Sequence, residues 1–127
     1  MNDASDAQLK VMQVNLREKL ASFSDHWSPR IVATFNDNDI MVVRVEGEFV
    51  WHAHPDTDDF FLVLEGELDI DLRDRTVTLG PGELFVVPQG VEHRPAARRG
   101  EVRMLLLEPC GAPNTGDERT AAHKPTI

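Results

Sequence analysis

The sequence predicts an all-β domain, a sandwich or barrel of short strands, preceded by a short N-terminal helix. Three observations predict this fold. Short apolar segments recur from Arg30 onward and are separated by turn residues such as those at 36–38. Within 67–73, apolar residues alternate with charged ones, the two-residue period of a strand with one buried and one solvent-facing side. Helical spacing of apolar residues occurs only before residue 24.

The helix is predicted over about 16–22, with an earlier start left open. Asn15, followed three residues later by Glu18, matches the capping box that often begins a helix. The apolar residues that recur at helical spacing are Leu9, Met12, Leu16, Leu20 and Phe23.

The strands follow one another with only short connections. We expect them at 31–35, 40–45, 49–54, 60–64, 67–72, 76–79, 84–87, 92–94 and 101–107. The chain thus divides into an N-terminal helix and linker (1–29), a β domain (30–108) and an extended C-terminal tail (109–127). The tail is rich in Pro, Gly, Thr and Asn and shows no periodicity.

Composition excludes several classes of function. The net charge of −9 disfavours nucleic acid and anionic membranes as partners, because phosphate binding depends on clustered Lys and Arg. The densest basic group, Arg94, Arg98, Arg99 and Arg103, is interpreted as a solvated rim or a salt-bridged strand end.

The single cysteine, Cys110, has no partner for an internal disulfide. Residues 1–10 contain no apolar signal region, and no stretch is long enough to span a bilayer, so we expect a cytoplasmic protein.

Four residues form a candidate metal site. His52 and His54 end a predicted strand, where residues two apart point to the same side. Asp59 adds a carboxylate, and His93 follows the turn at 88–90. Three imidazoles and a carboxylate suit one divalent transition metal, Mn, Fe, Ni, Co or Zn. A His-x-His pair is also common on protein surfaces, so the prediction depends on the spacing around the pair.

That spacing resembles the two sequence motifs of the cupin superfamily. In the first motif, a glycine precedes His-x-His, a glutamate follows, and a second glycine lies beyond six further residues. The matching positions here are Gly47, His52, His54, Asp59 in place of the glutamate, and Gly66. The second motif, a glycine, Pro-x-Gly and a histidine, is matched by Gly82, Pro88, Gly90 and His93. The resemblance implies a double-stranded β-helix, or jelly-roll barrel, and a homodimer.

Two positions depart from the family pattern. Asp59 is one methylene shorter than the expected glutamate, and Asp56 and Asp58 are nearby alternatives as ligands. The asparagine that usually follows the second motif is replaced by Ala97, so we expect this segment to be held differently.

The resemblance implies a metal-binding, single-domain cupin that takes a small-molecule ligand. One hypothesis is a metal-dependent enzyme acting on a small polar molecule, of oxygenase, isomerase or lyase type. The alternative is a non-catalytic binding or sensing protein. Some such cupins are described as mannose-6-phosphate isomerase-like, but this chain lacks the extra domains of the larger enzymes. Arg44 is a candidate anchor for a ligand or a solvent-facing side chain. The candidate pocket or core residues are Phe49, Trp51, Phe61, Val86, Met104 and Leu106.

Overall fold

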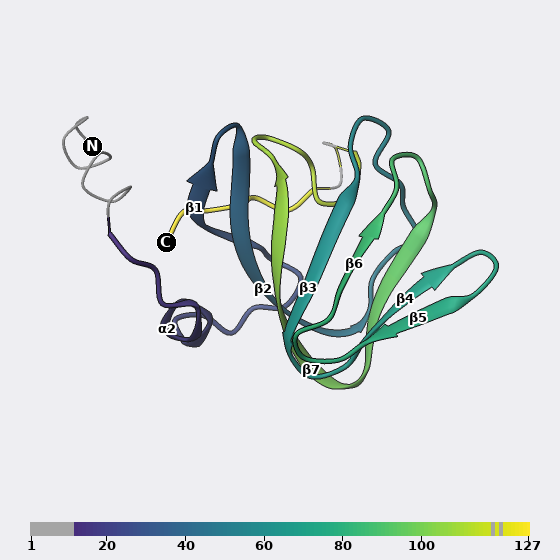
Figure 1. The fold of residues 1–127 in the computed structure, drawn as a ribbon, viewed down its shortest axis with the longest axis horizontal. Coiled ribbons are helices and arrows are strands. Elements are labelled where there is room, and N and C mark those ends of the chain that lie inside the picture. The colour runs from purple at the N-terminus through teal and green to yellow at the C-terminus, as the bar shows by residue number, and fades with distance from the viewer. Residues whose placement is uncertain (1–11, 118, 120) are drawn as a thin grey trace.

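The computed structural model describes residues 12–117, 119 and 121–127 (Figure 1). The helix α2 (Leu16–Ala21) is capped by Asn15, whose Oδ1 accepts a hydrogen bond of 3.0 Å from the backbone N–H of Glu18. This side-chain cap confirms the predicted start of the helix, because it satisfies one of the N–H groups that a first helical turn leaves unpaired. Leu20 anchors the helix against Val32 and Val42. The predicted apolar position at residue 9 lies outside the described residues.

The all-β fold predicted from the sequence is confirmed, but the described residues form seven antiparallel strands and not nine. They are β1 (Arg30–Phe35), β2 (Asn38–Glu48), β3 (Asp59–Glu65), β4 (Leu68–Leu72), β5 (Thr76–Leu79), β6 (Leu84–Val87) and β7 (His93–Pro109). Five are hydrogen-bonded in the order β1-β2-β7-β3-β6, and the β4–β5 hairpin joins them through β7. Figure 1 shows that this hairpin faces the larger layer, as in a jelly roll.

Two long strands carry the chain from one layer to the other. The end of β7 pairs with β2 and β3, whereas its beginning, from His93 to Ala96, pairs with β4. The sequence predicts two separate strands at 92–94 and 101–107, and this is wrong. The polar stretch around Gly100 is the bend of one continuous strand. Strand β2 shifts register between Val45 and Gly47, whose φ of +76° suits glycine, before it reaches Ala97 of β7.

The predicted strand at 49–54 is also wrong. These residues follow β2 as an irregular segment, and among them only His52 forms a β-bridge, with His93. The backbone N–H of Phe49 donates to the carbonyl of Pro95, and that of His52 donates to the carbonyl of His93. The segment therefore lies along the start of β7 but forms no continuous ladder.

The core lies between the two layers. Every strand from β2 to β7 contributes buried members, and the largest fully buried side chains include Met41, Leu68, Ile70 and Met104. In β3, Phe61 and Val63 face this core while Phe60 and Leu62 face outward, the alternation expected of a strand.

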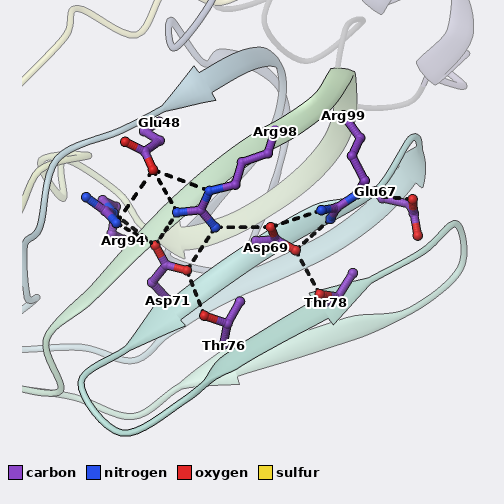
Figure 2. Close-up of polar contacts among 9 residues, drawn as sticks. All are labelled: Glu48, Glu67, Asp69, Asp71, Thr76, Thr78, Arg94, Arg98 and Arg99. Atoms are coloured by element: carbon purple, nitrogen blue, oxygen red, sulfur yellow. Dashed lines mark hydrogen bonds and ion pairs between the residues drawn. The ribbon is translucent and has the colours of Figure 1, made fainter.

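A network of charged residues covers the outer side of β4, β5 and β7 (Figure 2). Asp69 and Asp71 are only 4% and 6% exposed, so the expectation of a solvent-facing side is wrong for these two residues, whereas Glu67 and Arg73 are exposed as expected. Arg98 donates to both carboxylates and to Glu48, and Arg99 donates to Asp69. The alternation fixes the side on which the aspartates lie, but arginines from the neighbouring strand cover them. The prediction of salt-bridged arginines at this end of the strand is confirmed.

The C-terminal residues return to the domain (Figure 1). The backbone of Ile31 in β1 accepts from Ile127 and donates to Pro125. Lys124 donates to Glu108 at the end of β7, at 3.1 Å, and to the carbonyl of Ala112. These contacts hold the end of the chain against β1 and β7. None of the helices among the described residues has the length and apolar character required to cross a membrane.

Candidate metal centre

The β-bridge between the irregular segment and β7 brings two of the predicted ligands together. His52 and His93 exchange backbone hydrogen bonds of 3.0 and 2.9 Å. Residues directly opposite one another in an antiparallel pair project to the same side. Their imidazole rings are accordingly 4.4 Å apart. The convergence thus comes from pairing with β7, and the predicted regular strand through His52 and His54 is not its cause.

The other two predicted ligands lie beside this pair. Asp59 is the first residue of β3. It lies two residues before the inward-facing Phe61, on the same side of the strand, and is 4% exposed. The backbone carbonyl of His54 accepts from Gly90, and Gln89 donates from its backbone to Asp58 Oδ1 and from its side chain to the carbonyl of Pro55. These bonds tie the loop before β3 to the turn before His93. Asp58 is therefore engaged with the turn, and Asp59 is the carboxylate that joins the three histidines.

The four side chains meet around one carboxylate oxygen. Asp59 Oδ2 lies 2.8 Å from Nε2 of His93, 3.2 Å from Nε2 of His54 and 4.0 Å from Nε2 of His52. One potential ligand atom from each residue lies within 4.8 Å of all the others. Two ligand atoms that each lie about 2.1 Å from the same transition metal ion are separated from one another by at most about 4.2 Å. A contraction of about half an ångström would bring the cluster to coordination distances.

Backbone contacts orient two of the rings. Nδ1 of His52 lies 2.9 Å from the carbonyl of Val50, and Nδ1 of His93 lies 2.9 Å from the carbonyl of Val91. In the tautomer with its N–H at Nδ1, each ring donates to this carbonyl and presents the lone pair of Nε2 to the cluster. Histidines that bind metals are commonly fixed in this way.

Without a cation, the hydrogen bonding of this cluster is incomplete. A neutral imidazole has one N–H, yet both ring nitrogens of His93 face oxygen acceptors, Val91 O and Asp59 Oδ2. Nε2 of His54 is buried and makes no hydrogen bond with any described residue, although Asp59 Oδ2 lies 3.2 Å away. A metal ion among the four residues would accept these lone pairs, so the donor set fits a divalent transition metal.

The electrostatics of the cluster favour neutral His52 beside ionised Asp59. Burial lowers the pKa of His52 to about 4. Burial acts to raise the pKa of Asp59, but the approach of His54 and the hydrogen bond with His93 outweigh it and hold the pKa at about 2. For His54, the effect of burial is outweighed by Asp59 and, to a smaller extent, by Glu108, so its pKa is raised. Metal binding requires these imidazoles to be deprotonated.

A small cavity of about 40 Å³ adjoins the cluster, enough for about three water molecules. Its polar lining comes from His52, Asp59, Glu108 and Asn114, and the remaining lining residues are apolar. Those apolar residues are Trp27, Pro29, Val43, Val45, Phe49, Phe61, Pro95, Met104 and Leu106.

Several expectations about this cavity are changed by the structure. Phe49, Phe61, Met104 and Leu106 line it as expected, whereas Trp51 and Val86 do not. The guanidinium of Arg73 instead stacks over the Trp51 ring, with Cζ of Arg73 3.8 Å from the ring centroid of Trp51. Arg44 neither reaches the cavity nor faces solvent. It pairs with Glu101 and donates to the carbonyls of Leu20 and Phe23, so it joins the helix to the sheet.

Trp27 and Glu108 are two of the cavity residues that were not predicted. Trp27, in the linker before β1, stacks on Phe49 with ring centroids 4.7 Å apart. It belongs to no periodic pattern, and the sequence offers no signal for it. Glu108 is 3% exposed and was placed at the boundary of the tail. Burial and the charge of Asp59 raise the pKa of Glu108, against the opposing effect of Lys124. The sequence does contain a signal that Glu108 faces the cavity, because it lies two residues after Leu106 and therefore on the same side of the strand.

Comparisons with known proteins agree with this fold. A family model described as "Cupin domain" matches residues 39–108. The chain is 39% identical over 93 residues to the uncharacterized protein YdbB of Bacillus subtilis (strain 168), which covers 72% of this chain and 74% of YdbB.

Solved structures of similar chains have the same fold. A cupin-2 domain containing protein from Shewanella frigidimarina has a TM-score of 0.75 and 49% sequence identity, covering 80% of this chain and 97% of that one. The protein NMB1881 from Neisseria meningitidis has a TM-score of 0.70 and 29% identity, with 77% and 99% of the two chains covered.

Proposed function

The chain belongs to the cupin domain family, and we propose that it is a metal-dependent enzyme acting on a small molecule. In this proposal His52, His54, Asp59 and His93 bind one divalent ion, Mn, Fe, Ni, Co or Zn. The observation that carries it is the buried Nε2 of His54, which lies in a cluster of four potential ligand atoms and has no hydrogen-bond partner in the part of the chain that the structure describes. A buried polar atom without a partner costs free energy, and metal coordination would remove that cost.

The chemistry of the ion follows from its open positions. Four protein ligands leave coordination positions free on a metal that takes five or six, as catalytic sites require. The ion would supply positive charge to polarise a ligand oxygen. The chain itself would orient the ligand between Phe49, Phe61 and Met104, whose side chains line the cavity next to His52. These apolar walls would also limit the access of water.

The alternative is a non-catalytic protein that binds or senses a small molecule through the same metal. The enzyme is favoured because the cavity contains a further buried acidic residue, Glu108, outside the proposed ligand set. Turnover separates the two functions. A metal-loaded protein that binds small molecules and transforms none of them would support the alternative.

The metal itself is tested by elemental analysis of protein purified without chelator. We expect about one equivalent of a transition metal in the wild type and loss of it in His52→Ala. His123→Ala is the matched control, because His123 is exposed and lies outside the cluster. Asp59→Ala tests the carboxylate, and retention of metal there would remove Asp59 from the ligand set. Wild type with less than about a tenth of an equivalent, and no uptake on titration, would contradict the proposal.

The second part of the proposal is a homodimer formed through the outer face of β3, β6 and β7. The strand register places apolar residues side by side across this face. Leu62 of β3 lies between Leu84 of β6 and Leu105 of β7, and Phe60 of β3 lies between Val86 of β6 and Leu107 of β7. Strand β6 lies at the edge of the sheet, where Leu84 is 55% and Val86 40% exposed. A second copy of this chain offers a matching apolar face, and burial of such surface favours association.

Light scattering at micromolar concentration tests the dimer. We expect twice the chain mass for the wild type and the monomer mass for Val86→Glu. Val50→Glu is the control, since Val50 is similarly exposed but outside the named strands. A monomeric wild type would contradict this part of the proposal.

A further inference from the structure

Glu108 is an acidic residue at a position where β7 otherwise places apolar side chains. Val102, Met104 and Leu106 face the core at alternate positions, and Glu108 continues the same alternation with 3% of its surface exposed. A buried carboxylate costs stability unless it is paired. An apolar residue would serve the core better, so the presence of Glu108 indicates a role in the cavity that it lines.

The structure holds one oxygen of this carboxylate and leaves the other available. Lys124, from the returning C-terminal segment, donates to Oε2 at 3.1 Å. No described residue hydrogen-bonds to Oε1. Lys124 therefore compensates the negative charge and fixes the side chain, while Glu108 retains a free acceptor for a ligand in the cavity.

Glu108 also lies close to the proposed metal ligands. Phe60 of β3 pairs with Leu107 of β7, which places Asp59 and Glu108 next to one another at the same end of the two strands. Both side chains line the cavity, and the charge of Asp59 acts on Glu108. A ligand that contacts the metal from the cavity would thus have the carboxylate of Glu108 within reach.

The lining restricts the class of ligand. Among the described residues that line the cavity there is no Lys or Arg, and Lys124 is occupied by Glu108 and Ala112. A phosphate or a second carboxylate would meet two acidic residues and no cation, which disfavours sugar phosphates. The apolar walls and the small volume favour an uncharged ligand of a few non-hydrogen atoms.

We infer that Glu108 is the catalytic base of this site, and that it takes a proton from a small uncharged hydroxycarbonyl compound. This inference rests on the proposed function and deepens it toward isomerases and lyases. In the step, the C–H bond next to the carbonyl breaks and its proton passes to Oε1 of Glu108. The electron pair stays on the ligand and is delocalised onto the carbonyl oxygen. Return of the proton to the former carbonyl carbon, while the proton of the adjacent hydroxyl group passes to the former carbonyl oxygen, would complete an isomerisation, and no oxidant or reductant is required.

The test uses hydroxyacetone as the probe and the full chain loaded with Co²⁺. Exchange of its C–H protons with D₂O is followed by NMR, and occupancy of the metal centre by the visible absorption of Co²⁺. We expect the wild type to accelerate exchange and Glu108→Gln to lose about 100-fold or more of that rate, the scale of general base catalysis. Metal content and the spectral response to hydroxyacetone should be unchanged in Glu108→Gln.

Asp39→Asn is the matched control. Asp39 is 7% exposed and pairs with Glu108 in the β2–β7 register, but it does not line the cavity. It should retain wild-type exchange. If Glu108→Gln fails to fold, Glu108→Asp, which withdraws the carboxylate by one methylene, should lose exchange by more than 10-fold.

Each remaining outcome overturns the inference. Exchange in Glu108→Gln equal to that of the wild type would leave Glu108 as a structural partner of Lys124. Failure of metal-loaded wild type to exchange the probe would reject the hydroxycarbonyl assignment while the metal centre stands. Failure to bind metal would reject the proposed function as well.

Discussion

Asp71→Asn is expected to destabilise the protein by about 2–3 kcal/mol at pH 7. Asp71 accepts hydrogen bonds from Arg98, Arg94 and Thr76 at 2.6–3.0 Å (Figure 2). Each bond to a charged group contributes about 1.5–3 kcal/mol when buried. Asp71 is only 6% exposed, but the arginines that cover it remain partly in water, so screening reduces the sum to about one such bond. A shift of about 8–12 °C in Tm would accompany this loss.

The measurement is chemical denaturation of both proteins between pH 7 and pH 3. The hydrogen bond with Arg98, more than any other contact, holds the pKa of Asp71 well below its usual range. A carboxyl with a depressed folded-state pKa contributes stability above its unfolded pKa of about 3.9 and loses it as pH falls toward the folded value. The difference between wild type and variant should therefore shrink by about 1 kcal/mol from pH 5 to pH 3.

The control for this prediction is Asp74→Asn, the same change on the same hairpin. Asp74 is exposed, and Arg75 is its only ion-pair partner among residues 12–117, 119 and 121–127, so we expect a loss within about 0.5 kcal/mol. Equal losses for the two variants, or a difference that grows as pH falls, would refute the role given to the network.

Three further perturbations follow from particular contacts. Gly116 has φ of +78° and lies against the carbonyl of Ala53, so Gly116→Ala should destabilise the protein in thermal unfolding more than Gly82→Ala, which meets no neighbour. Phe61 is 3% exposed and packs edge-on to His93, so Phe61→Ala should cost about 3–5 kcal/mol by denaturant titration. Metal at 100 times its Kd should stabilise the wild type by about 2.7 kcal/mol, and a chelator should reverse this; an equal response in His52→Ala would contradict a specific site.

The four clustered residues could be predicted because their spacing carries the information. The sequence places His52 and His54 just before β3 and His93 at the start of β7, and the structure brings them together with Asp59. The assumed reason was incorrect in part. No regular strand aligns the histidines; a bridge between His52 and His93 does so, and such long-range pairing leaves no periodic signal in the segment itself.

Other features could not be predicted for identifiable physical reasons. Alternation assigns Asp69 to the outer side of β4, but it does not reveal that Arg98 and Arg99 of another strand cover that side. Glu108 follows the inward alternation of β7, yet a charged residue before Pro109 also marks the end of a strand. Trp27 reaches the cavity through a turn with φ of +59°, a conformation that no local pattern indicates.

The most direct test of the account is diffraction from crystals of the metal-loaded protein at wavelengths on either side of the metal's absorption edge. We predict one anomalous peak per chain, at about 2.0–2.2 Å from Nε2 of His52, His54 and His93 and from a carboxylate oxygen of Asp59. The side chains should move inward by about half an ångström from the spacing described here. A fully loaded crystal without such a peak, or with the peak bound elsewhere, would contradict the metal centre on which the proposed function depends.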